Sequence, residues 1–313
     1  MTNFPIRPKE NQNAGGDQAR GLRDLVARRA ASLTVRPSMT HGCHTIVVAG
    51  GKGGTGRSII ALNLAIVLSQ RGGRVGLLDA CPDLGSIELL CGLNGYWNLS
   101  HVMRGCRELD EVALTGPAGV KILSGANDLA VRHTNSTVVS DRVFDRLEVF
   151  ERKLDWLIVD ASGGNSESTC EFAFAADDVL IVATPEPTAV AEAYASVKSL
   201  SASGKSRLGL LVNQADSAAQ AQQILDRLQQ AAHSFLHVDL HRRGHIPRDI
   251  AVPTSVNEQV PFAIQAPDSA ATMALRKLTQ RWARPQPTEE ALSFFSRLNQ
   301  SKMNPCERRT AKT

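Results

Sequence analysis

The run AGGKGGTGRS, residues 49–58, combines five glycines with Lys52, Arg57 and Ser58. Glycines let successive backbone N–H groups turn toward one point, where they can hold phosphate oxygens. A hydroxyl at the start of the following helix can contact Mg²⁺. From Gly51 to Ser58 the spacing is that of a phosphate loop, G-x-x-x-x-G-K-[ST], with Arg57 at the lysine position. We predict that nucleotide phosphates bind to Gly51, Lys52, Gly53, Gly54, Thr55, Gly56, Arg57 and Ser58.

Two apolar runs end in an aspartate. Asp79 closes VGLLD and Asp160 closes WLIVD. A carboxylate at a strand end beside a phosphate loop can act on the Mg²⁺ of a bound nucleotide. The sequence therefore predicts a magnesium site formed by Ser58, Asp79 and Asp160.

Apolar stretches alternate with amphipathic ones through the body of the chain. We predict strands over 44–50, 74–80, 120–123, 155–161, 178–184 and 207–213, with a weaker one near 235–246. We predict helices over 56–71, 141–152, 187–203, 217–232 and 267–283. Apolar strands separated by helices indicate an α/β fold, a mostly parallel twisted sheet with helices on both faces.

Composition and charge divide the 313 residues into three parts. Residues 1–37 carry seven Lys/Arg and three Asp/Glu, and residues 300–313 carry four and one, while the body is slightly acidic. We predict an N-terminal segment with a short helix over 1–37, a nucleotide-binding domain over 43–284, and a C-terminal amphipathic helix and basic tail over 288–313. An acidic body argues against a nucleic-acid binder, so no sequence-specific nucleic acid is expected.

The C-terminal helix places Leu292, Phe295 and Leu298 on one face. Such a face fits a membrane surface, or docking on its own domain or on a partner. No run of 18 apolar residues and no signal-peptide core are present, so we expect a cytoplasmic protein, with peripheral contact at the inner face of the membrane as an alternative. The six cysteines form no C-x-x-C pair, and we expect free thiols.

The stretch KGGTGRS resembles the KGGxGK[ST] loop of the MinD/ParA superfamily, P-loop NTPases of the SIMIBI class with a deviant Walker A loop. The resemblance implies ATP and Mg²⁺ as cofactors and an ATP-dependent homodimer. It gives catalytic roles to Lys52, which reaches the partner's nucleotide, and to Asp79 and Asp160. It also implies that Asn213 contacts adenine and that the backbone near Pro247 lines the base.

Cys81 stands where this superfamily has a second aspartate that orients the attacking water. A thiol is a poor base and a poor water anchor near neutral pH. Slow ATP hydrolysis is therefore expected, unless Asp83 takes over the role. A non-hydrolysing scaffold of the same fold is the alternative.

Residues 17–23, DQARGLR, resemble the DQAxxLR motif of the FlhG family (FleN, YlxH), which regulates flagellar number and placement. Residues 184–194, TPEPTAVAEAY, resemble the same family, with Glu192 where aspartate is usual. The resemblance implies that an N-terminal activator helix contacts a signal-recognition-like flagellar GTPase (FlhF-type) through Asp17, Gln18, Leu22 and Arg23. A ParA-type partition ATPase is a further alternative.

Overall fold

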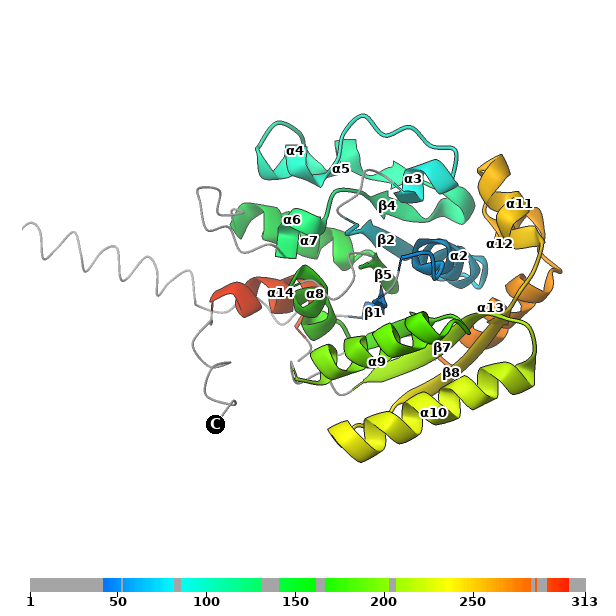
Figure 1. Ribbon diagram of the computed structural model, residues 1–313. Helices are drawn as coiled ribbons and strands as arrows, with labels where there is room; N and C mark the ends of the chain where they lie inside the picture. Colours follow the sequence, from blue (N-terminus) through cyan, green and yellow to red (C-terminus); the bar gives the residue numbers. More distant parts are fainter. Residues whose placement is uncertain are drawn as a thin grey trace, which may run out of the picture. The chain divides into compact units, whose positions relative to one another are not determined.

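The computed structural model describes residues 42–51, 53–81, 86–130, 141–161, 167–202, 207–282, 285 and 292–303. All of them belong to one unit, His41–Thr313. An eight-stranded sheet with the order β3-β4-β2-β5-β1-β6-β7-β8 forms its centre (Figure 1). Only β3 and β4 pair antiparallel, and all other neighbours are parallel. The predicted fold class is confirmed.

The strands lie close to the predicted ranges. They are β1 (His44–Ala49), β2 (Val75–Asp79), β3 (Leu114–Thr115), β4 (Lys121–Leu123), β5 (Trp156–Asp160), β6 (Asp178–Ala183), β7 (Leu208–Ala215) and β8 (His241–Pro247). The prediction near 235–246 is wrong in its first part, because a helix continues to Leu236 before β8 begins. The two-residue β3 was not predicted, since so short a strand leaves no alternating pattern.

The long helices were also predicted. They are α2 (Arg57–Gln70), α7 (Asp141–Glu151), α9 (Pro187–Ala202), α10 (Ala218–Leu236) and α13 (Ala270–Thr279). The sequence did not reveal α3 (Ser86–Leu90), α4 (Leu99–Met103), α5 (Leu109–Val112), the 3₁₀ turn η1 (Pro117–Gly119), α6 (Asn127–Ala130), α8 (Glu167–Ala175), α11 (Ala251–Glu258) and α12 (Phe262–Gln265). These elements span three turns or fewer, which is too short for a clear helical period.

Helices cover both faces of the sheet. On one face α2, α12 and α13 bury Ile60, Leu64 and Leu275 against strand residues such as Ile46. On the other face α7, α8, α9 and α10 bury a second apolar cluster that includes Phe172. Because both faces of the central strands are covered, their side chains are apolar at nearly every position.

The C-terminal helix α14 (Phe294–Met303) packs on the second of these faces (Figure 1). Phe294, Phe295 and Leu298 are fully buried there. The carboxylate of Glu151 accepts the backbone N–H groups of Phe294 at 2.8 Å and Phe295 at 3.2 Å, which satisfies two donors at the helix start. The structure thus shows the docked alternative, and this apolar face is not available for a peripheral membrane contact.

The predicted helix start at 288 lies outside the described residues, and Leu292 from the predicted apolar face stays half-exposed. Within the described ranges, no helix combines the length and hydrophobicity needed to cross a bilayer.

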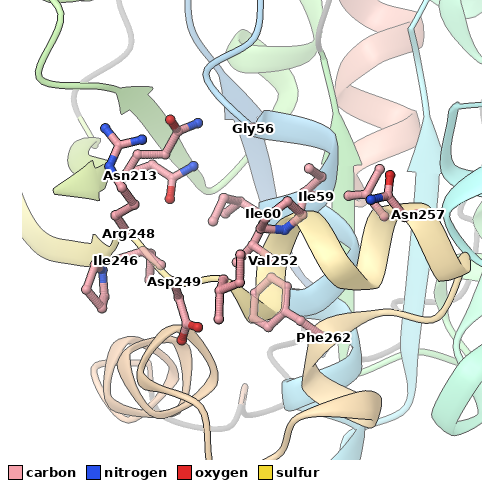
Figure 2. Close-up of a pocket in the computed structure, with 15 residues that line it drawn as sticks. Gly56, Ile59, Ile60, Asn213, Ile246, Arg248, Asp249, Val252, Asn257 and Phe262 are labelled. Carbon is pink, nitrogen blue, oxygen red and sulfur yellow. The ribbon is translucent and has the colours of Figure 1, made fainter. Parts of the chain in front are cut away.

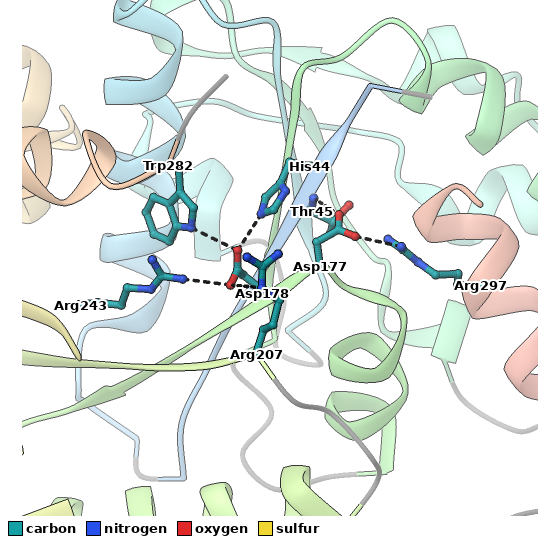
Figure 3. A network of polar contacts seen from close by, with 8 residues as sticks. All are labelled: His44, Thr45, Asp177, Asp178, Arg207, Arg243, Trp282 and Arg297. Atoms are coloured by element: carbon teal, nitrogen blue, oxygen red, sulfur yellow. Dashed lines mark hydrogen bonds and ion pairs between the residues drawn. The ribbon is translucent and has the colours of Figure 1, made fainter. Parts of the chain in front are cut away.

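A polar network closes the edge of the sheet where the parallel strands begin (Figure 3). The buried carboxylate of Asp178 accepts from His44 Nε2 at 2.8 Å, Arg243 Nη2 at 2.9 Å and Trp282 Nε1 at 3.2 Å. Arg207 lies 3.9 Å away. Burial alone would raise the pKa of Asp178, but the hydrogen bond from His44 and the charges of the two arginines outweigh it and hold this pKa below its usual value.

Candidate nucleotide site

The phosphate loop connects β1 to α2, as predicted. Gly54 and Gly56 have φ values of +82° and +84°, a region that L side chains rarely adopt. A Cβ at Gly56 would lie 2.6 Å from Nδ2 of Asn213, so only glycine fits there. A Cβ at Gly53 or Gly54 would meet nothing within 4 Å, which leaves that side of the loop open for a ligand.

The end of β7 holds this loop. Nδ2 of Asn213 donates to the carbonyl of Thr55 at 2.8 Å, and Nε2 of Gln214 lies 3.4 Å from the carbonyl of Gly54. Asn213 is 8% exposed, and it also lines the neighbouring pocket. Asn213 was predicted as a base contact, and the structure adds a second role, because its amide supports the phosphate loop. The contact of Gln214 was not predicted.

Asp79 and Asp160 lie side by side at the ends of β2 and β5, where they are register partners. Both are buried, with 1% and 0% of their surface exposed. Oδ1 of Asp79 accepts the N–H of Cys81 at 3.0 Å, and its Oδ2 lies 3.4 Å from the N of Ile87. Burial and the charge of Asp160 nevertheless raise the pKa of Asp79 to about 7. Two like charges in a poorly solvated place are a site that a divalent cation would relieve.

Cys81 belongs to the same place. It follows β2 directly, is half-buried, and binds Asp79 through its backbone N–H. The thiol therefore stands where the resemblance predicts a water-orienting carboxylate. Asp83, the predicted substitute, lies outside the described residues, as does Lys52.

Arg57 is at the predicted position, but its guanidinium has another partner. Nη1 donates to the carbonyl of Gly50, at the beginning of the loop, and the side chain is 7% exposed. The expectation of Arg57 as a phosphate contact is thereby changed, because at least one of its donors is used within the protein. The cause is local, since the loop brings Gly50 next to the first turn of α2.

A pocket of about 720 Å³ adjoins the loop (Figure 2). Ile59 and Ile60 of α2 form one wall, and Val252 of α11 and Phe262 at the start of α12 form another. Pro247, predicted as a base contact, belongs to the lining. The polar groups that line the pocket are Asn213, Gln214, Arg248, Asp249 and Asn257. An apolar pocket with a few polar groups, next to a phosphate loop, fits a nucleoside base.

The sequence did not predict the part that α11 and α12 take in this pocket. Both helices follow the IPRD stretch, residues 246–249, closely. A binding pocket is often walled by the segment that follows such a loop, and that proximity was the only available signal.

The residues present fit a nucleotide with Mg²⁺. Ser58 lies in the first turn of α2, while Asp79 and Asp160 end neighbouring strands at the same edge of the sheet. Hydroxyl and carboxylate oxygens are the ligands that Mg²⁺ prefers. Three of the predicted site's parts (the loop, the acid pair and the base pocket) are thus brought together, while the predicted partner residues Asp17, Gln18, Leu22 and Arg23 lie outside the described residues.

Comparisons with known proteins agree with this geometry. The ParA family model, described as NUBPL iron-transfer P-loop NTPase, matches residues 42–283. The antiactivator FleN of Pseudomonas aeruginosa is 34% identical over 259 residues, which cover 82% of this chain and 92% of FleN. The flagellum site-determining protein YlxH of Helicobacter pylori is 29% identical over 81% of this chain and 88% of its own length.

Solved structures share the fold at lower identity. The MinC:MinD cell division complex of Aquifex aeolicus has a TM-score of 0.61 and 19% identity, covering 76% of this chain and 95% of that one. MinD of Pyrococcus horikoshii, solved with Mg-ADP, has a TM-score of 0.61 and 18% identity over 76% and 95%. Together with the family match and the identity to FleN, the loop and acid pair show that the chain belongs to the ParA/MinD family of P-loop ATPases, in the group of FleN and YlxH.

Proposed function

We propose that this chain is a nucleotide-operated switch that regulates flagellar number and placement, with ATP and Mg²⁺ as cofactors. The observation that supports this best is the single sheet edge that carries the phosphate loop, the buried pair Asp79 and Asp160, and the base pocket. The similarity to FleN and YlxH supports the flagellar role.

Each part of the edge has its own task in the proposal. Backbone N–H groups of Gly53 to Gly56 and the start of α2 hold the phosphates. Ser58, Asp79 and Asp160 would hold Mg²⁺, which neutralises phosphate charge when bound. The pocket beside Pro247 takes the base, and Lys52 reaches the nucleotide of a second copy in the dimer.

We infer that hydrolysis is slow. Cys81 offers a half-buried thiol where a carboxylate would orient water, and loss of such a group costs about 10²–10⁴-fold in rate. Slow turnover would lengthen the life of the ATP-bound dimer. This separates a long-lived switch from a rapidly cycling one.

The N-terminal segment completes the proposal. Asp17, Gln18, Leu22 and Arg23 would contact a signal-recognition-like flagellar GTPase. Deletion of residues 1–32 should leave nucleotide binding intact and abolish stimulation of that GTPase. The proposal assigns α14 to the domain and not to a membrane surface, because its apolar face is part of the core.

Molar mass by light scattering tests the switch. We expect a monomer without nucleotide and with Mg·ADP, and a lasting dimer with Mg·ATP. The matched control is Ser58→Ala, which keeps the loop but removes a magnesium ligand and should stay monomeric. A monomer in every state, including one with a non-hydrolysable ATP analogue, would refute the proposed dimer.

Phosphate release tests the rate. Cys81→Asp should raise it by about tenfold or more, and Cys81→Ser, which adds no carboxylate, should not. Equal rates for the three proteins would show that Cys81 does not limit hydrolysis.

A further inference from the structure

The arginine at the lysine position of the loop is a charged group buried inside the protein. Arg57 is 7% exposed, and its Nη1 donates to the carbonyl of Gly50. A Cβ at Gly50 would lie 3.3 Å from Cδ and 3.7 Å from Nη1 of this arginine. The side chain therefore lies along the first residue of the loop, on the side opposite to a fully open phosphate cradle at Gly53 and Gly54.

Acidic groups balance this buried charge. Burial lowers the pKa of Arg57, while the negative charges of Asp160, Cys81 and Glu192 act to raise it. Asp160 is fully buried at the end of β5, and Glu192 comes from α9. A buried guanidinium without such neighbours would be strongly unfavourable.

Glu192 is placed against the next residue of the loop. A Cβ at Gly51 would lie 2.7 Å from Cβ of Glu192 and 3.1 Å from its Oε2. The backbone of Glu192 is fixed by α9, where its carbonyl accepts a hydrogen bond from Ser196 at 2.9 Å. Arg57 thus lies against Gly50, and Glu192 lies against Gly51.

We propose that Arg57 and Glu192 form a brace that sets the Gly50–Gly51 turn, so that Glu192 is a positioning residue and Arg57 is not chiefly a phosphate ligand. This inference rests on the proposed nucleotide site. A planar guanidinium can serve a backbone carbonyl and an acid at once, which the point charge of lysine does less well. Phosphate charge is then met by the loop amides, the start of α2 and Lys52.

A double-mutant cycle without nucleotide tests the brace. Its members are the wild type, Arg57→Met, Glu192→Gln and the double variant, and the readout is the melting temperature. Arg57→Met should lower it by about 5 °C. Glu192→Gln should lower it clearly when introduced alone and by less than a third as much in the Arg57→Met background, because the partner is already gone.

Asp226→Asn is the matched control. This exposed acid on α10 pairs with Arg242, far from the loop in sequence and absent from the pocket lining. Its effect should add to that of Arg57→Met. Additive effects of Glu192→Gln as well would overturn the brace.

Affinity for a fluorescent Mg·ADP analogue provides the second readout. Each single variant should weaken binding by about tenfold, and the double variant no further. A loss above 100-fold for Arg57→Met, with an unchanged melting temperature and no effect of Glu192→Gln, would instead make Arg57 a direct phosphate ligand.

Two further outcomes are separable. If Arg57→Met does not fold, Arg57→Lys replaces it, and the brace requires a melting temperature below that of the wild type even though lysine is the ordinary residue of such loops. If the wild type binds no nucleotide, the proposed function fails, while the cycle of melting temperatures still decides the brace.

Discussion

Two buried aspartates at opposite edges of the sheet have opposite surroundings. Asp178, where β6 begins, accepts hydrogen bonds from His44, Arg243 and Trp282. Asp79, where β2 ends, faces the carboxylate of Asp160. The first edge is electrostatically satisfied within the chain, and its aspartate stabilises the fold. The second keeps an unfavourable acid pair, which is the arrangement expected of a site that awaits a cation.

The largest expected effect is on activity at the second edge. Asp79→Asn should lower ATP hydrolysis by about 10³-fold, because one of the proposed magnesium ligands loses its charge. The melting temperature without nucleotide should not fall, since the repulsion by Asp160 is removed. A variant that is both active and less stable would place Asp79 among the structural acids like Asp178.

The next effect is a pH dependence with opposite signs at the two edges. The pKa of Asp79 lies at about 7, above the value of 3.8 for an unperturbed aspartate, so its contribution to stability is present below pH 4 and is lost as the pH rises through 7. The change corresponds to about 4 kcal/mol as an upper limit. The pKa of Asp178 is lowered, so its contribution is present above pH 4 and is lost in more acidic solution.

Urea unfolding of the nucleotide-free protein between pH 3 and pH 8 measures both. Asp79→Asn should flatten the decline between pH 4 and pH 7, and Asp178→Asn should flatten the acid side. Identical profiles for the wild type and Asp79→Asn would contradict the raised pKa.

A third expected effect is on the first edge alone. Asp178→Asn removes the charge that faces Arg207 and Arg243, and should lower the free energy of unfolding by about 3 kcal/mol at pH 7. The affinity for Mg·ADP should remain within twofold of the wild type, because the network lies at the opposite edge from the phosphate loop. A selective loss of nucleotide binding would remove the distinction between the two edges.

The smallest effect compares two glycines with the same backbone strain. Gly56 in the phosphate loop and Gly72 between α2 and β2 have φ values of +84° and +83°. Alanine at either position should cost about 1 kcal/mol of stability through its backbone. Gly72→Ala meets nothing within 4 Å, whereas the new methyl at Gly56 would lie 2.6 Å from the Asn213 amide. Only Gly56→Ala should weaken Mg·ADP binding, by about tenfold or more in a titration.

Much of the fold could be predicted because the central strands are apolar at nearly every position and end in marked residues. Asp79 and Asp160 follow such runs directly, and parallel strands bring their ends to one edge. The short elements α3 to α6 and the pair α11 and α12 carry too few residues for a pattern. The wall of the base pocket was therefore missed, although Asn213 and Pro247 were not.

The direction of the Arg57 side chain could not be predicted from the loop motif. It depends on the carbonyl of Gly50 and on Glu192, which is 135 positions away in the chain and arrives only when α9 packs. The seat of α14 has the same origin. A pattern of Phe295 and Leu298 shows an apolar face, but the partner carboxylate of Glu151 shows where that face goes.

The hydrogen bond from Asn213 to Thr55 joins base selection to phosphate retention. One amide both lines the base pocket and holds the loop, so a base that draws this amide toward itself also loosens the grip on the phosphates. Nucleobases of different edge chemistry would then enter the site at similar rates and leave at different ones. For a switch whose output is the time it stays assembled, the identity of the base would be read as a duration.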